Sequence, residues 1–437
     1  MQKRPRLPEW DILFHIKSIH KPGALGKLLS VIGEEGAIVG EITTEFVGKT
    51  YSFRNITVSV YDEENLNSII KAVNEKTEAT ILSYEDLVYE RHKGGKIHSG
   101  RKADVKTIWD LRYIYTPGVA RISKEIKADP SKAWDYTSIS SSVGIFTNGT
   151  RVLGLGDIGV LPAMPVMEGK AVIYDQFVGI GAVPILVDTK DPEEFVNIVE
   201  KVSSSFGGVH LEDIRMPDCF YIEDELIKRL KKPVMHDDQH GTATVTLAAV
   251  MSALRQTGHS KDKNLKVAQI GLGAAGFGIA KLLMDYGLKV TGSDINESSK
   301  KRLIDYGGKV EELDEAIKSA DIVIATTGVV GLIKKEMIKK GQIVLALSNP
   351  IPEISPEEAL EAGAAFASDG KSINNALAYP GLFKAALETN AQSITSEMKI
   401  AAAEVISKLA DESELVPSPF HPEVHKKVIE AVKKSVK

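Results

Sequence analysis

The sequence of 437 residues predicts an α/β protein of parallel, doubly wound sheets, preceded by a small separate α/β unit. From about residue 143 onward, short apolar runs alternate with segments of helical spacing, which is typical of parallel sheets. Residues 9–90 instead show the order β-α-β-β-α-β. The glycine- and lysine-containing stretch 91–101 lies between these parts, and we interpret it as a linker.

Composition and charge narrow the class of protein. The chain carries 54 basic and 59 acidic residues, a net charge of −5, so a nucleic-acid or anionic-membrane surface is not indicated. The single cysteine, Cys219, excludes an internal disulfide and favours a reducing compartment, the cytoplasm. No apolar core follows the charged amino-terminal residues, and the apolar stretch 171–187 contains Asp175 and Gln176. We therefore expect neither a signal peptide nor a membrane span.

The amino-terminal unit has the element order of a ferredoxin-like domain. Apolar and polar residues alternate over 11–19, and Pro22 and Gly23 then open a helix with an apolar face over 25–32. Its Pro-Gly-x-Leu turn resembles that of the ACT family of amino-acid-sensing regulatory domains. The resemblance implies that Gly23 lets an amino-acid or metabolite effector approach the backbone. A dimerisation module is an equally good interpretation.

Two acidic pairs dominate the middle of the chain. Glu212 and Asp213 end one predicted strand, a helix is predicted over 219–230, and Asp237 and Asp238 end the next strand. Strands joined by one crossover helix are normally parallel neighbours, so both pairs should meet at one sheet edge. Carboxylates that close repel one another unless a cation is bound, and an all-oxygen site suits Mg²⁺ or Mn²⁺. We also predict strands over 143–147 and 151–155, joined by a turn at 148–149.

The motif G-x-G-x-x-G occurs twice. We interpret the first, at 154–159, as a tight loop in another role, because Asp157 would face a pyrophosphate and Pro162 interrupts the following helix. The second follows a strand, opens a helix, and precedes Asp294 at the end of the next strand, as in a Rossmann domain that binds a dinucleotide. Its backbone would hold the pyrophosphate and Asp294 the ribose, which favours NAD over NADP. The residues of this loop are Gly271, Gly273, Ala274, Ala275 and Gly276.

Four domains follow from this pattern: 1–92, the ACT-like regulatory unit; 93–258, the substrate and metal domain; 259–390, the Rossmann domain; and 391–437, helices packing back on the catalytic core. A cation beside a nicotinamide suits hydride transfer from a hydroxyl carbon, because the cation polarises the carbonyl that forms. Where a carboxylate lies β to that carbonyl, the cation also favours decarboxylation.

Several motifs in order resemble those of the malic enzymes in their shorter prokaryotic form, from about residue 93 to the carboxyl end. They are Tyr115-Thr-Pro, the segment 151–159, Glu168-Gly-Lys170, the segments 211–214 and 236–243, and Leu347-Ser-Asn-Pro. The resemblance implies NAD-dependent oxidative decarboxylation of (S)-malate to pyruvate, assisted by Mg²⁺ or Mn²⁺. A homodimer or a higher homo-oligomer is expected, since ACT-like sheets commonly pair.

The resemblance also implies roles for individual residues. Glu212, Asp213 and Asp238 would bind the metal, with Asp237 beside them as a catalytic group. Lys170 would take the C2-hydroxyl proton, which requires burial or a nearby cation to lower its pKa, and Tyr115 would protonate the enolate. The substrate and cofactor pocket would be completed by Arg151, Thr326, Thr327, Asn349, and Asn374 or Asn375.

Three other functions are compatible with parts of the sequence. His236 and His240 stand at i and i+4, so on a helix they could bind zinc in a metallohydrolase. The ACT-like and Rossmann units could form a non-catalytic sensor of an amino acid and NAD. A related activity on oxaloacetate or another β-substituted 2-hydroxy acid is the third.

Overall fold

The computed structural model describes residues 8, 10–98, 100–259, 264–412 and 414–436, and the chain divides into two units, residues 1–98 and 99–437. Among the described residues, no helix combines the length and the apolar character that crossing a membrane requires.

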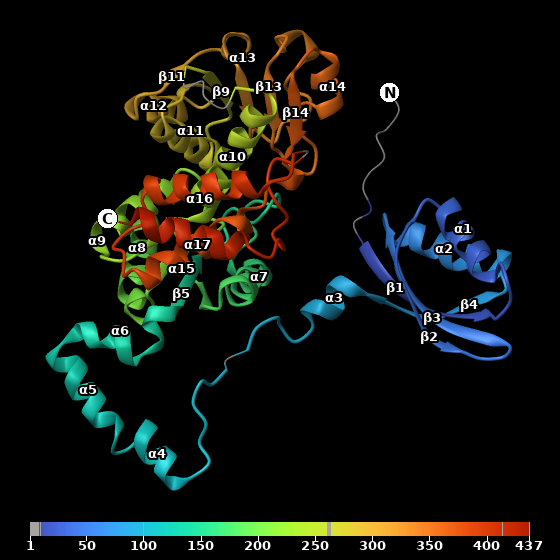
Figure 1. Cartoon of the computed structure of the whole chain (residues 1–437), viewed down its shortest axis with the longest axis horizontal. Coiled ribbons are helices and arrows are strands. Elements are labelled where there is room, and N and C mark those ends of the chain that lie inside the picture. Colours follow the sequence, from blue (N-terminus) through green and yellow to red (C-terminus); the bar gives the residue numbers. More distant parts are fainter. Residues whose placement is uncertain (1–7, 9, 99, 260–263, 413, 437) are drawn as a thin grey trace. The chain divides into compact units, whose positions relative to one another are not determined.

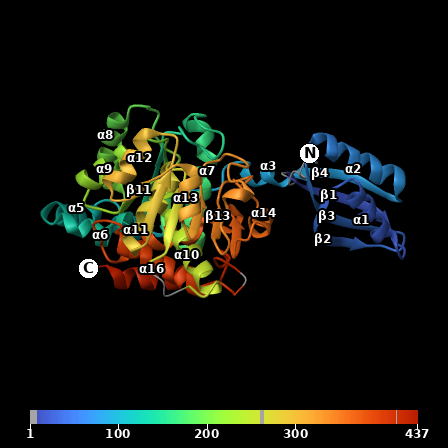
Figure 2. The same ribbon diagram turned by 90° about the horizontal axis from the view of Figure 1, so that it is seen from above.

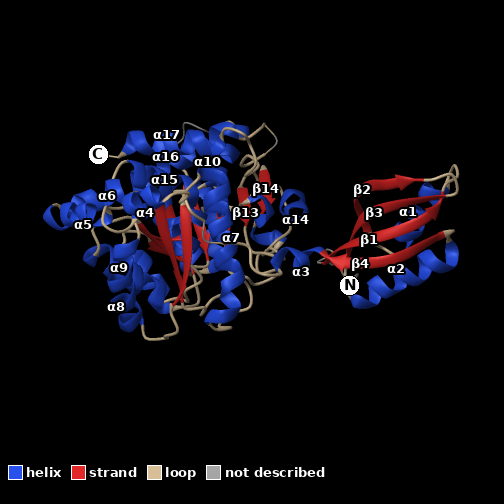
Figure 3. Cartoon of the chain, turned by 90° about the horizontal axis from the view of Figure 1, so that it is seen from below, coloured by secondary structure: helices blue, strands red, loops and turns tan. Residues whose placement is uncertain are grey.

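The amino-terminal unit has the predicted β-α-β-β-α-β order. Its antiparallel sheet has the strand order β2-β3-β1-β4, as Figure 3 shows. Alternate side chains of β1, among them Ile12, Phe14 and Ile16, are buried with Leu28 and Ile32 of α1, which explains the alternation in the sequence. The elements are β1 (Trp10–Ile19), α1 (Ala24–Glu34), β2 (Ile38–Val47), β3 (Tyr51–Val60), α2 (Glu63–Lys76), β4 (Ala79–Asp86) and α3 (Leu87–His92).

The second unit begins with short helices that bury none of their side chains: α4 (Ile108–Ile114), α5 (Val119–Ala128) and α6 (Ala133–Tyr136). Figure 1 shows α4 and α5 projecting from the rest of this unit. They carry exposed apolar side chains, namely those of Ile108, Trp109, Leu111, Tyr113, Ile114, Tyr115 and Val119.

A four-stranded parallel sheet of order β6-β5-β7-β8 follows. Its strands are β5 (Ser142–Thr147), β6 (Gly181–Leu186), β7 (Gly208–Leu211) and β8 (Val234–His236). The helices that connect them and leave the last strand are α7 (Val160–Val178), α8 (Pro192–Val202), α9 (Asp218–Arg229) and α10 (Asp237–Gln256).

Two predictions in this part of the chain are wrong. No strand forms over 151–155: the Val152 amide donates to the Gly156 carbonyl in a tight loop, in which Leu153 and Gly156 have positive φ. The helix after Gly159 is also not interrupted. Pro162 lies in the first turn of α7, where its missing N–H costs no helical hydrogen bond, and α7 continues through Pro165 to Val178.

The Rossmann sheet is entirely parallel, with the order β11-β10-β9-β12-β13-β14. This is the doubly wound arrangement that the alternating pattern predicts. Its elements are β9 (Lys266–Ile270), α11 (Ala274–Tyr286), β10 (Lys289–Ser293), α12 (Glu297–Asp305), β11 (Lys309–Val310), α13 (Leu313–Ser319), β12 (Ile322–Ala325), β13 (Ile343–Ala346), α14 (Pro356–Glu361) and β14 (Phe366–Asp369).

Three helices complete the unit: α15 (Tyr379–Glu388), α16 (Ser396–Leu409) and α17 (Val424–Ser435). α16 lies along α10, and α17 lies along α15 and α16 (Figures 1 and 2). The long helix α10 thus contacts the four-stranded sheet β6-β5-β7-β8, called the substrate sheet below, at its start. Along its length it contacts α11 and α16.

Candidate active site

The two acidic pairs meet at one edge of the substrate sheet. β7 and β8 are parallel neighbours, with Leu211 opposite His236, so the residues that follow each strand share an edge. Ligand oxygens of Glu212, Asp213 and Asp238 all lie within 4.8 Å of one another. The Asp213 amide donates to Asp238 Oδ2 at 3.1 Å, which ties the two strand ends together. Asp213 has a φ of 54°, a strained conformation for a residue with a side chain.

This cluster suits a divalent cation. Burial raises the pKa of Glu212 to about 7, and burial together with the charges of Glu212 and Asp238 raises the pKa of Asp213 to about 8. Within the described residues, the buried Asp213 Oδ2 has no hydrogen-bond partner. A bound cation would take this unused lone pair and offset the repulsion. An all-oxygen donor set is the preference of Mg²⁺ and Mn²⁺.

Lys170 reaches this cluster from α7. Its buried Nζ donates to Asp237 Oδ2 at 2.5 Å, lies 3.1 Å from Glu212 Oε1, and sits 4.6 Å from the centre of the Tyr379 ring. Burial alone would lower the pKa of Lys170, but the charges of Asp237 and Glu212 outweigh it and hold that pKa well above its usual value. The lowered pKa expected for a base is therefore not produced by burial. It requires a cation that offsets Glu212.

His210 belongs to the same cluster, although the sequence analysis did not include it. Its Nε2 lies 2.6 Å from Glu212 Oε2, and its Nδ1 lies 2.9 Å from the Tyr174 hydroxyl. Burial lowers the pKa of His210 to about 3, so the ring is neutral at pH 7 and orients Glu212 through one N–H. The signal was available, because residues i and i+2 of a strand face the same side.

A cavity of about 680 Å³ joins this cluster to the dinucleotide loop. Its wall includes Glu212, Asp213, Asp238, Lys170, Arg151, Asn375, Gly273, Ala274, Ala275, Gly276 and Thr326. The metal-site residues and the glycine loop therefore open onto one space. A substrate bound there can touch both.

The glycine loop has the local geometry that a pyrophosphate requires. Gly271 has a φ of 86°, and a Cβ at Gly276 would lie 1.9 Å from the Gly271 carbonyl oxygen. A Cβ at Gly273 would meet nothing within 4 Å, so a ligand can approach the backbone at the start of α11. Asp294 follows β10, and its Oδ2 accepts a hydrogen bond from the Leu272 amide at 2.6 Å. These residues fit NAD.

The sequence does not indicate which of Asn374 and Asn375 faces the cavity, but the structure distinguishes them. The amide of Asn375 donates to Asp237 Oδ2 at 2.5 Å, and Asn375 lines the cavity. The Asn374 side chain instead accepts from the Ala376 amide and caps a short 3-10 helix.

Two other predicted pocket residues face partners of their own. Thr327 donates its amide and its hydroxyl to Glu353 Oε1. The side-chain amide of Asn349 donates to the Gly370 carbonyl at 3.3 Å. Neither residue lines the cavity.

Tyr115 is not brought to this cavity. It directly follows the last residue of α4, is 65% exposed, and is absent from the cavity wall that contains Lys170. Figure 1 shows α4 well apart from α7 and α10.

The histidine pair does not form a zincin site. His236 ends β8, and only His240 lies on the helix, where its Nε2 is 3.0 Å from Glu223 and its Nδ1 is 3.1 Å from Lys399 Nζ. Both ring nitrogens of His240 are thus engaged by protein groups. The metallohydrolase interpretation is wrong.

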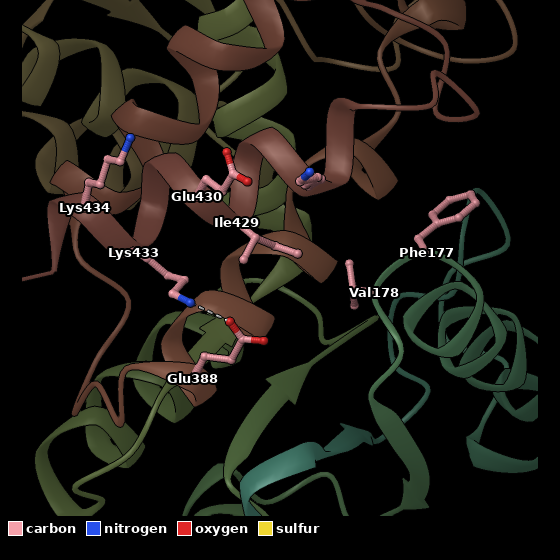
Figure 4. Close-up of a pocket in the computed structure, with 8 residues that line it drawn as sticks. Phe177, Val178, Glu388, Ile429, Glu430, Lys433 and Lys434 are labelled. Carbon is pink, nitrogen blue, oxygen red and sulfur yellow. Dashed lines mark hydrogen bonds and ion pairs between the residues drawn. The ribbon is translucent and has the colours of Figure 1, made fainter.

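A second cavity, of about 620 Å³, is lined by other elements than the first. It is lined by Phe177 and Val178 at the end of α7 and by residues of α15 and α17. Figure 4 shows the ion pair between Lys433 and Glu388 there. None of the clustered carboxylates at the β7 and β8 ends lines it, so it lies apart from the candidate active site.

Comparisons with known proteins agree with this geometry. Residues 96–227 match the family model of the malic enzyme N-terminal domain, and residues 239–320 match that of the malic enzyme NAD binding domain. The chain is 50% identical to NAD-dependent malic enzyme 1 of Bacillus subtilis, over 94% of each chain. It is 39% identical to the NAD-dependent malic enzyme of Geobacillus stearothermophilus, over 93% of this chain and 90% of the other.

Solved structures give the same result. The malic enzyme of Pyrococcus horikoshii matches with a TM-score of 0.74 at 38% identity, covering 79% of this chain and 89% of the other. The NAD-dependent malic enzyme of Thermotoga maritima matches with a TM-score of 0.74 at 35% identity, covering 80% and 99%. By these matches, the chain belongs to the malic enzyme family.

Proposed function

We propose that the chain catalyses the oxidative decarboxylation of (S)-malate to pyruvate and carbon dioxide, with NAD as the hydride acceptor. The observation that supports this most is the single cavity onto which the carboxylate cluster, Lys170 and the dinucleotide loop all open. The relatives from Bacillus subtilis and Geobacillus stearothermophilus are named NAD-dependent malic enzymes. The carboxylate at Asp294 opposes a 2′-phosphate, which favours NAD over NADP.

The protein groups divide the chemistry between them. When bound, Mg²⁺ or Mn²⁺ held by Glu212, Asp213 and Asp238 supplies Lewis-acid polarisation, and NAD supplies the hydride acceptor. Lys170 takes the C2-hydroxyl proton, and Asp237 holds its Nζ in place.

The remaining residues of the site orient the substrate. Arg151 lies at the cavity wall, where its guanidinium clamps a malate carboxylate. The side-chain amide of Asn375 donates to the same Asp237 oxygen that accepts from Lys170, and so helps to fix that carboxylate. Ordering of the reacting groups by such contacts supplies much of the rate enhancement in enzymes of this kind.

The experiment that tests this function is NADH formation from malate, with and without a chelator, for wild type and Lys170→Ala. We expect chelator to abolish turnover and the variant to lose about 100-fold or more in kcat. Lys201→Ala, an exposed lysine on α8, is the control and should behave as wild type. Chelator-insensitive turnover, or full activity of Lys170→Ala, contradicts the mechanism.

The exposed position of Tyr115 supports the proposal that the chain forms a homodimer. An arm of exposed apolar side chains on α4 and α5 is typical of a segment that packs on another copy of the chain. In this arrangement Tyr115 of one copy enters the cavity of the partner and protonates the enolate there. Each cavity is then completed by a residue from the other chain.

Mixed dimers test the arrangement. Lys170→Ala and Tyr115→Phe are each inactive alone, but random mixing restores one intact cavity in half of the molecules, about a quarter of wild-type activity. If Tyr115 acts within its own chain, mixing restores nothing. Lys170→Ala mixed with Lys170→Met provides the control, since no pairing of these chains contains an intact cavity.

The amino-terminal unit is proposed to bind a small effector at Gly23. A cavity of about 300 Å³ lies around this residue, with His20, Lys21 and Arg54 in its wall. Gly23 has a φ of 83°, and a Cβ there would meet nothing within 4 Å. Titration calorimetry with amino acids and carboxylate metabolites tests the site, with Gly23→Val as the variant that should lose binding. The absence of binding by wild type contradicts the proposal.

The cellular location is proposed to be the cytoplasm, where NAD and malate are available. Cys219 is the single cysteine of the chain and is free, so no disulfide forms within it.

A further inference from the structure

One buried carboxylate outside the cavity holds the start of α10. Glu223, on α9, is 4% exposed and does not line the cavity. Its Oε1 accepts from the backbone amide of His236 at 2.7 Å, and its Oε2 accepts from the side chains of Gln239 at 3.1 Å and His240 at 3.0 Å. The residues that carry these three donors, His236 on one side and Gln239 and His240 on the other, flank Asp237 and Asp238 in the sequence.

The strand-helix junction depends on these bonds. His236 is the N-cap residue of α10 but makes no side-chain capping bond, and neither of its buried ring nitrogens has a hydrogen-bond partner among the described residues. Gly278 of α11 also packs on this turn, so closely that a Cβ there would lie 2.4 Å from the Gln239 carbonyl oxygen. The first turn of α10 is therefore contacted both by Glu223 and by α11.

We propose that Glu223 is a positioning residue for the metal site. By fixing His236 to His240, it keeps Asp238 beside Asp213 and keeps Asp237 on Lys170. A carboxylate is favourable here because the first turn of a helix presents unpaired N–H groups and a partial positive charge. The proposal rests on the metal role of Glu212, Asp213 and Asp238 given above.

The chemistry of the contact distinguishes a carboxylate from an amide of the same shape. In Glu223→Gln, one of the two accepting oxygens becomes an NH₂ group that faces donors. Gln239 can turn its amide to compensate. His240 cannot reverse its donor and acceptor, because its Nδ1 already accepts from the ammonium of Lys399 at 3.1 Å.

Direct measurement of Mn²⁺ binding tests the proposal. With isothermal titration calorimetry on the full chain without substrates, Glu223→Gln should raise the Kd for Mn²⁺ by about 10- to 100-fold. In steady-state assays at fixed Mn²⁺, the KM for malate should rise with it while the KM for NAD stays at the wild-type value. A merely structural role would lower the melting temperature without separating the two KM values.

The matched control is Glu193→Gln. Glu193 on α8 pairs with Arg229 at the far end of α9, so this variant removes a carboxylate contact of the same helix without touching the junction. Its Mn²⁺ affinity should equal that of wild type.

Three results decide the question. Wild-type Mn²⁺ affinity in folded Glu223→Gln overturns the proposal. If that variant does not fold, Gln239→Ala decides: it removes one donor, so about fivefold weaker Mn²⁺ binding supports the proposal and unchanged binding overturns it. A wild-type chain that binds no Mn²⁺ overturns the proposed function instead.

Discussion

A methyl group added at Gly241 should lower kcat far more than it lowers the free energy of unfolding. Gly241 lies in the second turn of α10, one helical turn after Asp237. A Cβ at this position would lie 1.9 Å from Asp237 Oδ1, 2.8 Å from Asp237 Cγ and 3.2 Å from the Cβ of Asn375. The substitution Gly241→Ala therefore acts on the carboxylate that holds Lys170.

The size of the effect follows from these distances. Contacts of real Cβ atoms below 3.0 Å are essentially absent, so Asp237 must retreat by at least about 1 Å. Asp237 holds Lys170 Nζ at 2.5 Å, so the base moves with it. A displacement of about 1 Å of a reacting group costs on the order of 100-fold in rate. The stability change is smaller, because overpacking costs about 1–3 kcal/mol while alanine in a helix returns about 1 kcal/mol.

The assay compares kcat for malate with urea unfolding of the same preparations. Gly33→Ala is the matched control: Gly33 lies inside α1, and a Cβ there would meet nothing within 4 Å. This control should gain about 1 kcal/mol in unfolding free energy and keep full activity. Near wild-type kcat in folded Gly241→Ala would refute the reasoning.

Three further predictions concern the cofactor loop and a buried lysine. Gly276→Ala places a Cβ 1.9 Å from the Gly271 oxygen, so the KM for NAD should rise about 10-fold or more while the KM for malate is unchanged. Asp294→Ser should lower kcat/KM for NAD roughly tenfold relative to NADP, since it removes one charged hydrogen-bond acceptor for the ribose; equal loss with both cofactors contradicts this role. Burial lowers the pKa of Lys399 from 10.5 to about 8, so the folded chain binds this proton less tightly than the unfolded chain. Stability should therefore rise as the pH passes from about 8 to 10.5, by up to about 3 kcal/mol, a rise that urea unfolding of Lys399→Met should lack.

The carboxylate cluster was predictable because its geometry is set by chain order. One strand, one helix and one strand place β7 beside β8 in parallel, so residues after each strand must meet. The glycine loop was predictable for the same reason, since its strand, its helix and Asp294 lie close together in sequence. These features depend on local pattern and on the handedness of one crossover.

The contacts around Lys170 could not be predicted in this way. Its partner Asp237 lies 67 residues further along the chain, and Asn375, which donates to the same oxygen of Asp237, lies 138 residues beyond Asp237. Glu223 lies within the helix predicted over 219–230, and its place there does not indicate its partners at the start of α10. The strand predicted over 151–155 does not form. The apolar spacing of these residues suits a strand, but the positive φ of Leu153 and Gly156 turns the chain into a loop. Local pattern carries no information on such tertiary choices.

The helix α10 begins with the carboxylates that follow β8, is 20 residues long and packs on α11, the helix of the dinucleotide loop. The position of the carboxylate cluster relative to the glycine loop is therefore maintained by a helix about 30 Å long and by its side-chain packing on α11. This makes the chain a candidate for division into two fragments. A cut after α10 leaves this helix, with the face that packs on α11, on the first fragment. Two separately expressed fragments should therefore reassociate into an active enzyme.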